Sequence, residues 1–327
     1  MSFSYGQDKH RTQWGSASAW RGQRQKRVNK SIGNSATSAP IELAEGLALR
    51  KGVESPFTIV IEPSKGWASL GLRDVWEYRE LLYFLVWREV KGRYRQMAFG
   101  PLWIIIQPLI NMVILSIVFG GLAKLPSDGV PYPIFTYVAL LPWQFFASGT
   151  RNASHSLLEQ QHVIAKVYFP RLVIPLASVI SAFVDFMASF VILVGMLVFY
   201  RVTPRWEFLT LPLFLLLAGI SALAIGLWLA GLAVKYHDVS IAIGFGMTIW
   251  QYLTPVAYSA SLVPSEWQTL YRLNPMYSVV TGFRWALLGI GQAPDWTVLA
   301  SSVLILLLLI SGAYYFRRTE RTIVDVI

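Results

Sequence analysis

The chain of 327 residues contains no cysteine and only four histidines. The missing thiols exclude disulfides, thiolate metal sites and cysteine nucleophiles. The histidines are scattered and lack the spacing of a ligand set, so we predict no metal site and no acyl-transfer site. They are His10, His155, His162 and His237.

A phosphate-binding loop is also absent, because no glycine-rich segment leads into Lys followed by Ser or Thr. We therefore expect no cofactor in this chain and no ATP hydrolysis by it. A membrane-embedded glycan-modifying enzyme would need paired acids near a surface, whereas Asp128, Asp238 and Asp295 stand singly. The enzyme reading stays open only as an alternative.

Charged residues make up just 14% of the chain, against 54% hydrophobic residues and a mean hydropathy of +0.48. A soluble domain of this length is rarely so apolar, so the composition predicts an integral membrane protein. The formal net charge is +10, and residues 1–99 hold 16 of the 28 Lys and Arg. Basic segments beside membrane spans favour the cytoplasmic face. We expect membrane lipids, and no nucleic acid, as their partner.

The composition divides the chain into three parts. Residues 1–56 are rich in Ser, Gly, Gln, Asn and basic residues and have no apolar period, which predicts a disordered basic cytoplasmic tail. Residues 57–100 form a cytoplasmic segment in which 57–63 could be a short strand or an extended docking segment. Within it, residues 74–96 run from acids through aromatics to bases, the order of a helix lying at a membrane surface. Residues 101–327 form the transmembrane domain.

We predict an all-α fold with six transmembrane helices. Each predicted span is an apolar run long enough to cross a bilayer, which takes about 20 residues. The runs are 101–123, 129–150, 172–200, 208–234, 239–265 and 297–316. The fifth should end early or break at Pro255 and its glycines. In the fourth, Gly219, Gly226 and Gly231 indicate close helix packing.

Two apolar pieces before the last span, 273–283 and 285–294, are each too short to cross and are separated by Arg284. We interpret them as a re-entrant helical pair on the periplasmic side. A seventh span would place the arginines of 317–321 outside, against the positive-inside rule. Six spans place both termini in the cytoplasm. The proposed inside segments hold 23 of the 28 Lys and Arg, but only seven against five beyond residue 99.

Several residues are candidates for function. Asp185 lies in mid-span without an evident titratable partner, so it is either a structural acid or the proton relay of a gradient-driven transporter. Lys91, Arg93 and Arg95 precede the first span and could attract a lipid diphosphate, or simply anchor the chain. Flat aromatic rings stack on sugars, and Trp250, Tyr252 and Tyr258 are candidates for a glycan channel or for an interfacial belt.

The stretch 163–175, "VIAKVYFPRLVIP", lies between the second and third spans, on the predicted cytoplasmic side. Its two prolines limit where helix can begin and end. We expect Tyr168 and Phe169 to expose aromatic surface suited to an anchor in a partner's pocket. Otherwise these rings rest among lipid headgroups.

An ordered set of motifs resembles the permease subunits of ABC-2 type exporters for O-antigen, capsular polysaccharide or teichoic acid. The match runs from about residue 57 to the end. The motifs are "LRDVWEYRELLYFLVWREVKGRYRQMAFGPLW" (72–103), "KVYFPRLVIPLASVISAFVDF" (166–186), "KYHDV" (235–239), "YLTPVAYSASLVP" (252–264), "LNPMYSVVTGFRWALLG" (273–289) and "FRRTERTIVDVI" (316–327).

The resemblance implies a homodimer in the bacterial inner membrane, joined to two copies of an ABC ATPase subunit that bind ATP and magnesium. It implies a polysaccharide on a polyprenyl diphosphate as substrate. It also implies an interface helix near 74–96, periplasmic gate helices near 264–291, and a coupling helix near 156–169 seated on the ATPase. The coupling residues would be Glu159, His162, Lys166, Tyr168 and Phe169.

Overall fold

The described part of the chain is helical and contains no strand. The computed structural model describes residues 72–95, 99–164, 169–203, 205–236, 238–291 and 293–326. The chain divides into two units, Met1–Gly66 and Trp67–Ile327, and all the helices described below belong to the second. The predicted tail 1–56 and the segment 57–63 lie outside the described residues.

Four helical stretches are long and apolar enough to cross a membrane: Gly100–Leu122, Val173–Phe199, Trp206–Lys235 and Trp296–Thr319. They coincide with four of the predicted spans. The first joins a short 3-10 turn to α5 (Trp103–Leu115) and the π-helical segment η2 (Ser116–Leu122). The others are α8 (Val173–Phe199), α9 (Leu211–Lys235) with the turn η3 (Trp206–Thr210) before it, and α13 (Trp296–Val326).

Helix α6 (Tyr132–Glu159) is the centre of the helical unit, packed between α8 and α9. It continues nine residues past the predicted end at 150. Its contact with α9 is close, because a Cβ on Gly226 would lie 2.6 Å from the Cβ of Ala153. The glycine prediction is confirmed here, and also at Gly231, where a Cβ would meet the ring of Tyr315 at 2.6 Å.

Helix α10 (Asp238–Leu253) ends before Pro255, as predicted, and two short helices follow: α11 (Ser265–Leu273) and α12 (Pro275–Leu288). The predicted division of this region at Arg284 is wrong. The chain breaks at Asn274, whose side-chain oxygen accepts a hydrogen bond from the backbone N–H of Met276 at 3.1 Å and caps α12.

Arg284 lies inside α12 and is buried. Its guanidinium donates to the carbonyl oxygens of Pro255 (2.7 Å), Val256 (2.7 Å) and Tyr258 (3.0 Å). It also lies 3.7 Å from the ring centroid of Phe135 on α6. A buried cation needs such partners, so Arg284 holds the irregular segment after α10 against α6 and α12.

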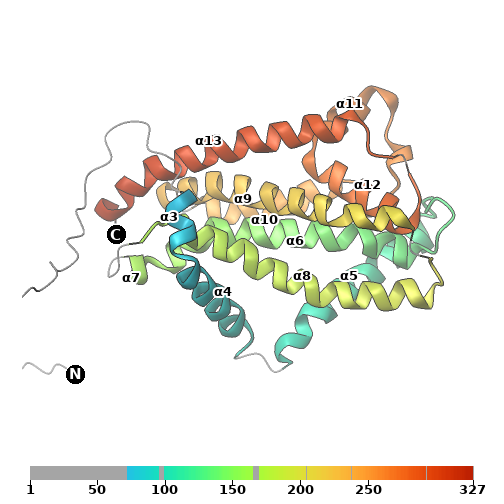
Figure 1. The fold of residues 1–327 in the computed structure, drawn as a ribbon. Coiled ribbons are helices and arrows are strands. Elements are labelled where there is room, and N and C mark those ends of the chain that lie inside the picture. Colours follow the sequence, from blue (N-terminus) through green and yellow to red (C-terminus); the bar gives the residue numbers. More distant parts are fainter. Residues whose placement is uncertain are drawn as a thin grey trace, which may run out of the picture. The chain divides into compact units, whose positions relative to one another are not determined.

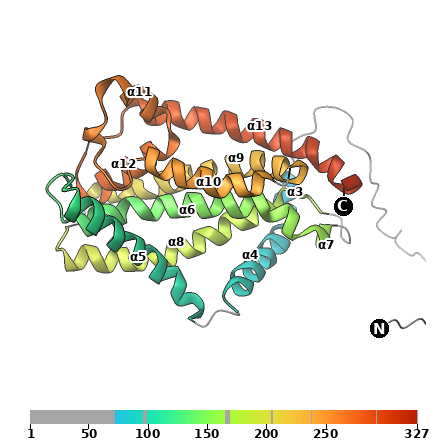
Figure 2. The same cartoon turned by 180° about the vertical axis from the view of Figure 1, so that it is seen from behind.

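The long helices α6, α8, α9, α10 and α13 run side by side in both views (Figures 1 and 2). Their connections alternate between two ends. One end carries α7 (Gln161–Ile164), the α9–α10 turn and the C-terminal end of α13, and we call it the α7 end. The opposite end carries α11 and the loop between η2 and α6, and we call it the α11 end.

The predicted surface helix 74–96 is two helices, α3 (Leu72–Glu77) and α4 (Arg79–Tyr94), with a break at Tyr78. Helix α4 packs against α8. It buries Leu85, while Tyr83, Phe84 and Trp87 are exposed. Apolar side chains therefore lie on more than one face of α4, as the uninterrupted apolar run within it indicates.

Candidate functional site

The accessible stripe of α6 is polar. Between Ile134 and Leu157 nearly every residue of this helix is buried, and the residues that are not buried recur at helical spacing on one face. They are Gln144, Ser148, Arg151, Asn152 and His155. A helix face turned to lipid would be apolar, so this face borders water or a polar ligand.

The part of this stripe from Gln144 to Asn152 forms one wall of a groove with a volume of about 810 Å³ between α4, α5, α6, α8 and α10. Each of these helices contributes polar side chains from a single face. The polar lining residues are Arg93, Gln107, Asn111, Gln144, Ser148, Arg151, Asn152, Asp185, Ser189, Thr248 and Gln251. Amides and hydroxyls predominate, which are the groups that exchange hydrogen bonds with sugar hydroxyls.

Aromatic rings complete the groove. Trp143, Phe145 and Phe186 belong to its wall and are themselves buried, so they shape the groove rather than fill it. Trp103, at the start of α5, is 41% exposed. Its indole is therefore partly accessible, and a ligand in the groove can contact it.

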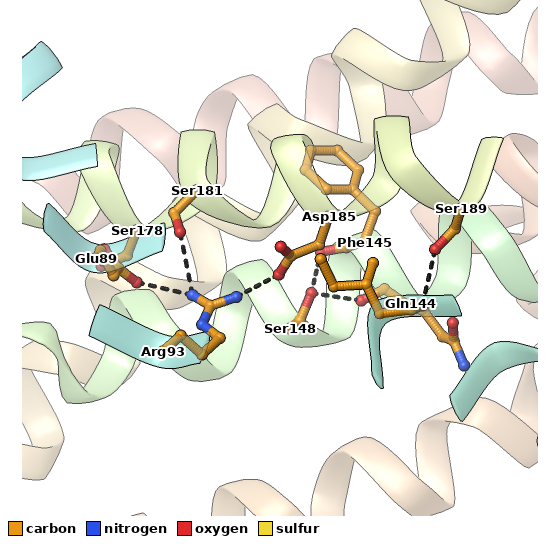
Figure 3. A network of polar contacts seen from close by, with 10 residues as sticks. Glu89, Arg93, Gln144, Phe145, Ser148, Ser178, Ser181, Asp185 and Ser189 are labelled. Atoms are coloured by element: carbon orange, nitrogen blue, oxygen red, sulfur yellow. Dashed lines mark hydrogen bonds and ion pairs between the residues drawn. The ribbon is translucent and has the colours of Figure 1, made fainter. Parts of the chain in front are cut away.

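An ionic network closes the groove on the side of α4 (Figure 3). Arg93 reaches from α4 to α8, where it forms an ion pair with Asp185 and donates to the hydroxyl of Ser181 at 3.1 Å. The same guanidinium pairs with Glu89, one turn earlier, at 3.1 Å. Glu89 accepts a hydrogen bond from Ser178 at 3.2 Å, so two residues of α4 are joined to three of α8.

Burial raises the pKa of Glu89 above its usual range, while Arg93 and the Ser178 hydroxyl oppose the rise. Asp185 forms an ion pair with Arg93, a partner that the sequence alone does not reveal. The sequence predicts no titratable partner for Asp185 in the nearby spans, and the partner comes instead from α4, outside the predicted spans. The pairing supports the structural reading of this acid, and the proton relay stays the alternative.

The three cations proposed to attract a lipid diphosphate have different surroundings. Lys91 and Arg95 are exposed. Arg93 is only partly exposed and is engaged with Glu89 and Asp185. The structure does not gather the three into one cluster, and their role towards a diphosphate stays a prediction.

The three proposed channel aromatics are also separated. Trp250 packs against Phe146, with ring centroids 5.3 Å apart, and donates its indole N–H to Asn274 at 3.1 Å. Tyr252 is exposed, and its carbonyl oxygen accepts a hydrogen bond from the Tyr258 hydroxyl at 3.1 Å. None of the three lines the groove, so their contact with a glycan stays a prediction without support from this geometry.

The proposed coupling residues surround α7. Glu159 ends α6 and is exposed, as is His162 in α7. Lys166 and Tyr168 lie outside the described residues. The expectation that Phe169 exposes its ring is wrong, because it is only 4% exposed and belongs to an apolar cluster with Leu85, Leu157 and Phe316. Phe169 therefore anchors this segment to α4, α6 and α13.

Metal chemistry has no evident site. Within the described ranges, no group of three or more His, Asp or Glu side chains is placed to hold a metal ion.

The groove residues that the sequence analysis missed belong to several helices. The signal present in the sequence was the spacing of Gln144, Ser148, Arg151 and His155, which begins inside the predicted second span and runs past its end.

Residues 80–288 match the family described as ABC-2 type transporter. The O-antigen export system permease protein RfbA of Myxococcus xanthus is 29% identical over 255 residues, which is 76% of this chain and 96% of that protein. The protein of the same name from Klebsiella pneumoniae is 27% identical over 206 residues, 63% of this chain and 79% of the relative. The inner membrane transport permease YadH of Escherichia coli K12 is 28% identical over 212 residues, 60% and 80% of the two chains.

Proposed function

Because the chain belongs to the ABC-2 type transporter family and is a multi-pass membrane permease rather than an enzyme, we propose that it exports a polysaccharide of the O-antigen type. The substrate is a glycan attached to a polyprenyl diphosphate, moved from the cytoplasmic to the periplasmic side of the inner membrane. A separate ABC ATPase, in two copies, drives the transport.

One observation carries this proposal: the polar stripe of α6 and the groove that it lines. A polysaccharide in transit must exchange its hydrogen bonds with water for others, and it needs partners that tolerate a moving chain. Neutral amides and hydroxyls on α5, α6 and α10, beside the accessible ring of Trp103, provide such partners. A fixed array of charges would instead hold one position of the chain.

The groove of one chain is open, and a second copy would close it. Helices α5 and α10 border the groove and carry exposed apolar side chains, among them Ile110, Ile114, Phe245 and Ile249. In the proposed homodimer these faces meet the partner or the lipid. The six-span arrangement counts α6 and α10 as crossings, with α11 and α12 as the re-entrant pair. Both termini are then cytoplasmic, and the α7 end faces the ATPase.

Deleting the gene in its bacterial host tests the function. We expect the surface polysaccharide to disappear and the lipid-linked polymer to accumulate in the cytoplasm, and the wild-type gene to reverse both changes. A glycan that still reaches the surface at the normal level, or a polymer that is never synthesised, contradicts the proposal.

A further inference from the structure

The groove contains one cation that no acid in the described residues neutralises. Arg93, Arg151 and Asp185 are the charged residues that line it. Arg93 and Asp185 pair with each other, and Arg93 also pairs with Glu89. Arg151 donates its Nε hydrogen to the carbonyl oxygen of Ala147 at 3.3 Å and forms no ion pair with any described residue. Its terminal nitrogens are thus available.

Uncharged donors share the stripe with this guanidinium: Asn152 is the next residue, and Gln144 lies about two helical turns away. The side-chain amides of Gln144 and Asn152 share its stripe and make no hydrogen bond to other described side chains or backbone. Ser148, by contrast, already donates to the carbonyl oxygen of Gln144 at 2.7 Å. The stripe therefore offers a guanidinium fork and two amide groups to a ligand. That combination suits a phosphate, whose several oxygens accept charge-assisted hydrogen bonds.

The position of Arg151 along α6 matches a phosphate of membrane origin. Arg151 lies eight residues before Glu159, the last residue of α6, so it is about 12 Å from the α7 end at 1.5 Å per residue. In the six-span arrangement proposed above the α7 end faces the cytoplasm, so Arg151 lies in the half of α6 nearer the cytoplasmic headgroups. A phosphate at that surface of the bilayer is the anion nearest to it.

We propose that Arg151, with the amide of Asn152, binds the diphosphate of a prenyl diphosphate in the part of the groove nearer the α7 end. The inference rests on the proposed function and adds where the anionic head of the substrate is held. The isoprenoid tail stays in the lipid beside the groove, and the first sugars extend towards Trp103 and the amides of α5.

The test is equilibrium binding of radiolabelled farnesyl diphosphate to the full-length chain in nanodiscs of phosphatidylcholine. We expect Arg151→Gln to weaken binding by about tenfold or more, because a charge-assisted pair of hydrogen bonds is lost. Arg151→Lys should fall between the two, since a lysine keeps the charge without the fork. Arg318→Gln is the matched control, because it removes an exposed arginine at the α7 end outside the groove, and it should bind as the wild type does.

Competitors identify the source of the phosphate. Farnesol and inorganic pyrophosphate should each compete much less well than unlabelled farnesyl diphosphate. Equal competition by pyrophosphate would mean that a free anion suffices, and full competition by phosphatidylglycerol in the nanodisc would mean an ordinary lipid headgroup. Either result overturns the prenyl diphosphate assignment, as does unchanged binding by Arg151→Gln.

The binding site and the export function can fail independently of each other. A wild-type chain that exports glycan in cells but does not bind farnesyl diphosphate overturns this inference alone. A chain that binds it through Arg151 yet exports no glycan leaves the site intact and overturns the export function.

Discussion

The ion pair between Arg93 and Asp185 should hold α4 against α8, and replacing Asp185 with Asn tests this. The change keeps the size of the side chain and removes its charge. Arg93 then retains Glu89 on α4 and the Ser181 hydroxyl on α8 but loses the only one of these partners on α8 that carries a charge. Breaking a fully buried ion pair by removing one partner costs about 3–5 kcal/mol.

Both side chains keep some contact with solvent, with 25% of Arg93 and 19% of Asp185 exposed, so the full cost does not apply. We expect Asp185→Asn to lower stability by about 2 kcal/mol. For a domain of this size the loss corresponds to a fall in Tm of about 4–8 °C. The assay is the temperature at which the purified protein loses its monodisperse peak in size-exclusion chromatography.

A double-mutant cycle isolates the pair from the other contacts of each residue. Arg93→Met and Asp185→Leu, alone and together, should show a coupling free energy of about 1–2 kcal/mol. The exchanged variant, Arg93→Asp with Asp185→Arg, should recover part of the stability and of the export. If the free-energy changes of the two single variants simply add in the double variant, the pair does not hold α4 against α8. Export lost in Asp185→Asn at unchanged stability, and not recovered in the exchanged variant, would favour a proton relay instead.

Three further predictions concern other parts of the molecule. Burial raises the pKa of Glu89 in the folded protein, so its contribution to stability is complete at low pH and is lost as pH rises through that pKa. Glu89→Gln should therefore flatten this part of the pH profile of the thermal unfolding temperature. An unchanged profile would mean that another group titrates there. Trp103→Ala should lower export severalfold while the amount of the permease in the membrane stays normal. Trp296→Ala, which removes an exposed tryptophan outside the groove, should leave export unchanged. Equal effects of the two variants would contradict a stacking role of Trp103. Cysteines introduced at Glu159 and His162 should crosslink to the ATPase subunit, and crosslinks to lipid alone would contradict the coupling assignment.

Hydropathy was enough to locate the helices that are apolar along their whole length. The stretches 172–200 and 208–234 have no competing pattern, and the structure places α8 and α9 within a few residues of them. Helix α6 was cut short at 150, because its polar stripe lowers the hydropathy of its second half. This half of α6 is buried by α8 and α9 on one side and accessible along the stripe on the other, and an average along the sequence does not separate the two faces.

Contacts between distant segments account for the remaining differences. The sequence does not reveal the partner of Asp185, because Arg93 precedes it by 92 residues and lies outside the apolar runs. Arg284 was taken for a boundary because a cation ends an apolar run, but carbonyl oxygens freed by the irregular chain after α10 satisfy it within α12. The sequence predicts Phe169 at the surface because it lies in a connection between two predicted spans, yet it completes the cluster with Leu85 and Phe316.

The central claim, that the polar stripe of α6 lines the path of the glycan, is tested most directly by cysteine accessibility in the naturally cysteine-free chain. Single cysteines at Gln144, Ser148 and Asn152 would be treated with a charged, membrane-impermeant thiol reagent in inverted membrane vesicles that export glycan. We predict that each reacts, that export stops on reaction, and that a cysteine at the exposed, apolar position Val191 outside the groove neither reacts nor affects export. Stripe cysteines that stay unreactive, or that react fully while export continues, would contradict the account.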